Sequence, residues 1–142
     1  MAAHTGLFFA ALGAEPADGT LSQSLATTPG ANYTVDWWLK SDGMVPNHFK
    51  VTFGGTILAD LTNSSAFNWT HFSFNATAPT STTLFQISES NVGGLLSLDD
   101  VGVNIAAAAV PAPAAIWSGL VLLAAVAGIA RARARAHSSQ SR

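Results

Sequence analysis

Two tryptophans stand where an alternating pattern would turn them toward solvent. Trp38 falls between Asp36 and Lys40 on the polar side of its run, and Trp69 shares a polar-leaning side with His71. An exposed indole with polar neighbours can stack on a sugar ring, because it combines a large apolar face with a polar edge. The same indole can also cover a sheet or pack under a loop, since tryptophan is highly buried on average. Trp38 and Trp69 are therefore candidate ligand-binding residues, and the structural alternative stays open for both.

An acidic position in a later apolar run suggests a different chemistry. Asp99 has the same alternation as Val101, Val103 and Ile105, so a strand that buries those residues also turns Asp99 inward. A buried carboxylate needs hydrogen bonds, a cation or a proton. We therefore expect Asp99 either to accept hydrogen bonds from loop amides or to ligate a metal ion. Its neighbour Asp100 would face the opposite side, so the two cannot act as a catalytic pair from one strand.

Several catalytic and metal-binding chemistries lack the residues they need. The chain has no cysteine, which excludes disulfides, thiolate metal sites and a cysteine nucleophile. No nucleophile elbow frames a serine. The histidines have no spacing typical of a zinc site; they are His4, His48, His71 and His137. We expect a protein that is not an enzyme.

The elements that must position these side chains are short alternating runs typical of β-strands. The runs lie at residues 6–12, 19–27, 33–40, 49–53, 56–59, 69–76, 82–88 and 95–105. One run is expected to bury Tyr33, Val35, Trp37 and Leu39. A pair of glycines at positions 54 and 55 predicts a hairpin. No helical periodicity interrupts the runs, so we predict an all-β domain, an antiparallel jelly roll or β-sandwich, over residues 1–105.

The opening residues 1–14 have a short apolar stretch with no preceding Lys or Arg, which argues against a signal peptide. We prefer a strand from Gly6 to Leu12. The chain is then expected to be part of a longer exported protein whose domain has lost its first strands.

The end of the chain has a different composition. Residues 114–130 carry no charge and would form a helix of about 26 Å, close to the short limit for crossing a bilayer. An Ala/Pro linker at residues 106–113 precedes this expected transmembrane helix, and a basic tail at residues 131–142 follows it. The positive-inside rule places the tail in the cytoplasm and residues 1–105 outside. The alternative is a buried C-terminal helix of a soluble domain.

Charge is distributed in keeping with a membrane segment. All eight acidic residues lie before residue 110, together with Lys40 and Lys50, whereas all four arginines lie in the tail. A basic patch confined to the flank of an apolar run indicates a membrane, and we expect no nucleic-acid partner.

The order of parts at the C-terminus resembles the PEP-CTERM class of bacterial sorting signals. The step Val110-Pro111-Ala112-Pro113 is followed by the apolar segment and then by the membrane stop and orientation residues Arg131, Arg133 and Arg135. The resemblance implies export, temporary anchoring in the inner membrane and processing by an exosortase-type enzyme near the Pro-x-Pro step. This chain departs from the pattern in two ways: it lacks the glutamate of Pro-Glu-Pro, and its arginines alternate with alanine.

The body resembles the galactose-binding-like jelly rolls of carbohydrate-binding modules. The resemblance rests on the stretches at residues 19–25 and 27–35 and on Leu98-Asp99-Asp100-Val101-Gly102-Val103. It implies a structural Ca²⁺ near the first and last strands, with Asp99 as a ligand. Calcium takes six to eight oxygens, however, and the strand expected to supply the others is missing from this sequence.

Two functional hypotheses follow from these patterns and resemblances. The first is a non-enzymatic, exported surface or extracellular-matrix protein. It would be held in the inner membrane by a single pass, and exosortase processing would release it to the cell surface or the exterior. The alternative is a carbohydrate-binding module that recognises a glycan through its exposed aromatics. The expected partners are the membrane, the processing enzyme and a polysaccharide.

Overall fold

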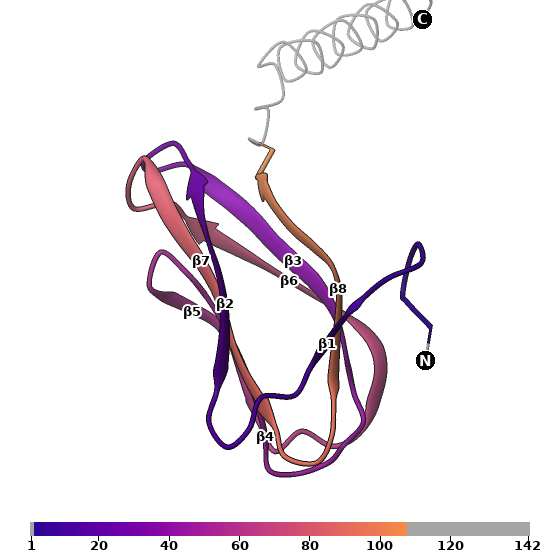
Figure 1. Cartoon of the computed structure of the whole chain (residues 1–142). Helices are drawn as coiled ribbons and strands as arrows, with labels where there is room; N and C mark the ends of the chain where they lie inside the picture. Colours follow the sequence, from indigo (N-terminus) through magenta and orange to yellow (C-terminus); the bar gives the residue numbers. More distant parts are fainter. Residues whose placement is uncertain (1, 108–142) are drawn as a thin grey trace, which may run out of the picture. The chain divides into compact units, whose positions relative to one another are not determined.

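The computed structural model describes residues 2–107, which form two four-stranded antiparallel sheets (Figure 1). The strands are β1 Ala10–Leu12, β2 Gly19–Ala26, β3 Asn32–Ser41, β4 Asn47–Phe53, β5 Thr56–Thr62, β6 Phe67–Thr77, β7 Thr82–Asn91 and β8 Leu96–Ile105. One sheet, called sheet A here, has the order β1-β8-β3-β6, and sheet B has the order β2-β7-β4-β5. The all-β prediction is confirmed for these residues.

The chain changes sheet at almost every connection. Of the described connections, the one between β4 and β5 joins two strands of the same sheet, and the others cross from one sheet to the other. Crossing connections of this kind are typical of a jelly-roll or Greek-key sandwich. Within residues 2–107 there is no helix that is long and apolar enough to cross a membrane. The expected sorting motif, transmembrane helix and basic tail fall outside the described residues.

Two turns follow from local sequence chemistry. Gly54 and Gly55 have φ angles of 58° and 82°, which L side chains rarely adopt, and they form the two-residue β4–β5 hairpin as predicted. Before β3, the N–H of Ala31 donates to the carbonyl of Thr28 at 3.0 Å. Gly30, with a φ of 77°, occupies the position of this turn that requires a left-handed backbone.

The core forms between the sheets from alternate residues of the central strands. Val35, Trp37 and Leu39 on β3 are fully buried, as predicted from their alternation. Trp37 packs beside Phe72 and Phe74 of β6, with ring centroids 5.7 and 5.5 Å apart. Sheet B contributes the second half of this core through Phe49, Val51, Phe53, Phe85 and Ile87. The β3 residues that alternate with this buried set therefore lie on the outer face of sheet A, away from sheet B.

A β-bulge in β8 reverses the expected direction of Asp99. Leu98 pairs with Leu39 and Val103 pairs with Val35, so both share the inner face, although they are five positions apart and uninterrupted alternation would place them on opposite faces. The ladder shifts by one residue between these points, where Asp100 has a φ of 48°. Asp99 pairs directly with Trp38 and therefore lies on the outer face. The prediction that Asp99 points into the core is wrong, because period-2 alternation does not survive the extra residue.

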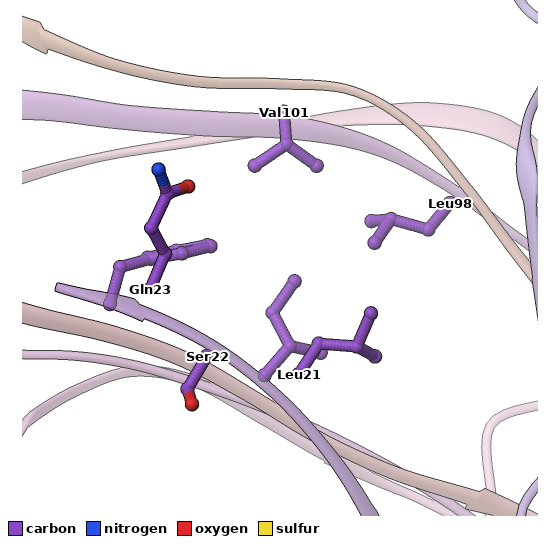
Figure 2. A pocket seen from close by; sticks show the side chains of 7 residues that line it. Leu21, Ser22, Gln23, Leu98 and Val101 are labelled. Atoms are coloured by element: carbon purple, nitrogen blue, oxygen red, sulfur yellow. The ribbon is translucent and has the colours of Figure 1, made fainter. Parts of the chain in front are cut away.

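The edge of β8 is only partly covered. β1 pairs with β8 at Leu96–Leu98, and beyond that point the described chain provides no further strand on this side. Val101 is 44% exposed and Leu21 of β2 is 45% exposed. Together with Leu98 they line an open apolar pocket of about 240 Å³, toward which their side chains point in Figure 2.

Candidate functional site

The outer face of sheet A brings together the aromatic residues singled out from the sequence. Trp38 of β3 lies opposite His71 of β6, and their rings stack with centroids 5.0 Å apart. Trp69 lies on the same strand and face as His71. Trp38, Trp69 and His71 are called the aromatic platform below. The inward burial of Trp37 and Leu39 holds this platform outward, because neighbouring strand residues point to opposite faces.

A residue far away in the sequence completes this cluster. The imidazole of His4 stacks on Trp38 with a centroid distance of 3.7 Å and an interplanar angle of 17°. The same ring meets the edge of Trp69 at 6.0 Å. Phe9 also meets Trp69 edge to face at 6.0 Å, and the Trp69 indole N–H donates to the carbonyl of Ala2 at 3.3 Å. Nothing in the sequence near His4 indicates this role, since the contact spans more than thirty positions.

The strand predicted at residues 6–12 therefore forms only at its end. β1 is Ala10–Leu12, and residues 2–9 run across the outer face of sheet A without joining a ladder. Gly6 turns the chain with a φ of 62°. The carboxylates of β8 bind this segment instead, which explains why regular strand pairing stops short of it.

Asp99 and Asp100 bind the N-terminal segment. Asp99 Oδ2 accepts hydrogen bonds from the backbone N–H groups of His4 and Thr5, at 2.9 and 3.3 Å. Asp100 accepts from the Thr5 hydroxyl at 2.5 Å and lies 2.8 Å from His4 Nδ1. The bonds from Thr5 and His4 lower the pKa of the Asp100 carboxyl below its usual value. His4 and Thr5 are therefore held against β8 at its bulge.

Hydrogen bonds account for both carboxylate oxygens of Asp99. Its second oxygen, Oδ1, accepts the N–H of Asp100 at 2.8 Å, so both oxygens are engaged by backbone amides. Across residues 2–107 no group of three or more His, Asp or Glu side chains gathers as a metal site would require. Calcium takes six to eight oxygens, which include backbone carbonyls as well as carboxylates, so a structural Ca²⁺ at Asp99 stays a prediction. Of the two expectations for Asp99, the amide-bonded carboxylate describes its contacts.

Polar groups flank the aromatic platform on two sides. Asp36 Oδ2 lies 3.3 Å from His71 Nε2 on one side. On the other, Lys40 and Asn68 line a shallow hollow of about 340 Å³ with Ser41, Ala66 and Phe67. A carboxylate, an ammonium and an amide around stacked rings offer both donors and acceptors beside an apolar surface. Such a face suits a ligand that is apolar on one side and carries hydroxyls around its rim.

Comparison with known proteins gives a likeness in structure. No protein-family model matches the chain, and no curated protein sequence matches it. Among solved structures, the C-terminal domain of EclA, a sugar-binding protein, is similar with a TM-score of 0.54 and 16% identity; the match covers 70% of this chain and 81% of that one. TmCBM61, solved in complex with β-1,4-galactotriose, matches with a TM-score of 0.53 and 20% identity over 72% and 74% of the two chains.

A family 35 carbohydrate-binding module from an environmental isolate is similar at a TM-score of 0.50 and 20% identity, over 75% of this chain and 82% of that one. At these identities the likeness concerns the fold. Residues 2–107 therefore have the jelly-roll β-sandwich fold seen in carbohydrate-binding modules.

Proposed function

We propose that residues 2–107 form a non-catalytic carbohydrate-binding domain that receives a glycan on the outer face of sheet A. The observation that supports the proposal most directly is the aromatic platform of Trp38, Trp69 and His71, set among polar side chains on the outer face of sheet A. Two similar folds support it: EclA is described as a sugar-binding protein, and TmCBM61 was solved with β-1,4-galactotriose.

The recognition follows from the geometry of this face. A pyranose ring would lay its C–H face on the Trp38 indole, which is held by the β3 backbone and by the buried Trp37 and Leu39 beside it. Its hydroxyls would then meet the Asp36 carboxylate and the Lys40 ammonium at either end of the same strand face. A platform on strands is more precisely positioned than one on loops, so the Trp38 ring itself needs little rearrangement to meet a sugar.

The test is affinity electrophoresis of the full chain in mild detergent against a panel of soluble polysaccharides that begins with β-1,4-galactan. At least one polysaccharide should retard the protein. Trp38→Ala should weaken retardation at least about tenfold, the equivalent of roughly 1.4 kcal/mol. Ile57→Ala is the matched control, because Ile57 is 55% exposed on sheet B, away from the platform. Equal retardation of Trp38→Ala and wild type would exclude this face as the binding site.

We further propose that the C-terminal segment delivers this domain to the cell surface. The support is the order of Pro111 and Pro113, the uncharged residues 114–130 and the arginines at 131, 133 and 135. The segment would cross the inner membrane once with the sandwich outside, until an exosortase-type enzyme cleaves near the Pro-x-Pro step. Residues 106–142 fused behind an exported reporter should place it in the membrane fraction. A freely soluble fusion would exclude this proposal.

A further inference from the structure

One face of the Trp38 indole in the aromatic platform is already covered by a residue of the same chain. His4 lies flat on Trp38 at 3.7 Å, which is the stacking distance at which another flat ring would sit. Phe9 and the carbonyl of Ala2 contact Trp69. Trp38 is half-buried although it stands on the outer face of its sheet, and both His4 and His71 stack on it. A sugar cannot stack on this side of the indole while His4 remains there.

The covering segment is attached by contacts that can open without unfolding the sandwich. Residues 2–9 belong to no strand, so their release breaks no ladder. The segment is held at His4 and Thr5 by the two carboxylates of the β8 bulge. Between these contacts and Phe9 it loops outward, with Leu7 and Phe8 87% and 85% exposed. The segment is thus held at its two ends and free in its middle.

We propose that residues 2–9 act as a strap that closes the aromatic platform and must move aside before a glycan can stack on Trp38. This inference rests on the proposed carbohydrate-binding function and adds its regulation. Asp99 and Asp100 are the positioning residues, since they hold the strap and lie beside the platform. The strap and the glycan compete for one surface, so the apparent affinity equals the intrinsic affinity reduced by the fraction of molecules in which the strap is open.

Two variants should open the strap by different routes. His4→Ala combined with Thr5→Ala removes the stacked ring and the hydroxyl that bonds to Asp100. Asp100→Asn leaves both strap side chains in place but weakens their anchor, and asparagine tolerates the positive φ of this position. Phe8→Ala is the matched control, because Phe8 lies on the strap and is largely exposed.

The first measurement does not depend on any sugar. In the full chain in mild detergent, with Trp117→Phe in every variant, acrylamide quenching reports on Trp38 and Trp69, because Trp37 is fully buried. Both opening variants should be quenched more strongly than the parent and the Phe8→Ala control, with an unchanged melting temperature for the sandwich. Equal quenching in all four proteins would show that the strap does not cover the platform and would overturn the inference.

The second measurement uses β-1,4-galactan with the same proteins. Both opening variants should bind about five- to tenfold more tightly than the parent, as expected when a competing segment is removed. Weaker binding by the His4/Thr5 variant would show that His4 belongs to the binding surface and would overturn the strap. If no variant binds galactan or any other polysaccharide of the panel while quenching increases, the proposed function and the gating role are both wrong, and the quenching still shows that the platform had been covered.

Discussion

His48 of β4 and Asp18, which precedes β2, meet across the outer face of sheet B, with His48 Nδ1 2.6 Å from Asp18 Oδ2. The other ring nitrogen lies 3.0 Å from Asp60 of β5, so one imidazole links three segments of the chain. Ser90 of β7 donates to the second oxygen of Asp18 at 2.7 Å. The cluster lies on the other sheet from the aromatic platform. Its two aspartates approach opposite nitrogens of the His48 ring, so these side chains do not converge on one point as metal ligands would.

This cluster should make stability depend on pH. Burial works to lower the pKa of His48, but the bonds to Asp60 and Asp18 outweigh it and raise the pKa above its ordinary 6.5. The His48 contribution is therefore fully present below pH 6.5 and is lost as the pH rises through the raised pKa. The bond from Ser90 and the proximity of His48 lower the pKa of Asp18 below 3.8, so its contribution is lost only at more acidic pH.

Melting temperatures measured between pH 5 and 9 should fall on the alkaline side, and His48→Gln should flatten that fall. His71→Gln is a suitable comparison, since His71 is exposed and approaches Asp36 at 3.3 Å. An unchanged slope in His48→Gln would mean that the cluster does not couple protonation to folding.

A second prediction concerns Trp37 in the core between the two sheets. Its side chain is fully buried, and its indole N–H has no hydrogen-bond partner among residues 2–107. Trp37→Ala should lower the free energy of unfolding by about 3–5 kcal/mol, because it leaves a large cavity between the sheets. Trp37→Phe should cost clearly less, since it keeps much of the volume and removes an unsatisfied buried donor. Urea unfolding of both variants gives the comparison, and equal losses would contradict it.

The parts of the fold that local patterns determine were predictable. Trp37 and Leu39 turn inward because alternation in β3 is uninterrupted, and Gly54-Gly55 forms its hairpin because glycine accepts both positive φ angles without steric cost. The outward placement of Trp38 followed from the same alternation. The bulge at Asp100 was missed, although the apolar positions of this stretch change from even numbers, Leu96 and Leu98, to odd numbers, Val101 and Val103, on either side of it.

The partner of Trp38 was also beyond sequence reasoning. His4 reaches the platform because Asp99 and Asp100, nearly a hundred positions later, bind its backbone and its ring. Residues 6–9 do not form the expected strand, and the segment is held by these side-chain contacts instead. Contacts between residues so far apart in the sequence depend on the order and connection of the strands, which a single sequence shows only in outline.

A third prediction separates two glycines that share a backbone conformation. Gly43 and Gly55 have φ angles of 85° and 82°, so alanine is strained at both. At Gly43 an added Cβ would also lie 2.5 Å from the backbone nitrogen of Ala66, whereas at Gly55 it would meet no atom of the described residues within 4 Å. Gly55→Ala should cost about 1 kcal/mol and Gly43→Ala distinctly more, because backbone cannot yield as a flexible side chain can. Chemical denaturation of the two variants measures the difference, and a larger loss at Gly55 would show that the Ala66 segment can move.

The last prediction concerns the open edge of β8. Val101 lies at the mouth of the apolar pocket with Leu21, on a strand whose outer edge beyond Leu98 has no strand partner among residues 2–107. Unpaired strand edges with apolar neighbours favour association between molecules, and a charged side chain there opposes it. A fragment of residues 1–107 should therefore self-associate as its concentration rises. Val101→Lys should reduce this association, whereas Leu84→Lys should not, because Leu84 is similarly exposed but sits on β7 between two strands. Light scattering across a concentration series measures the effect. A fragment that stays monomeric, or an equal response to both lysines, would show that the β8 edge does not drive association.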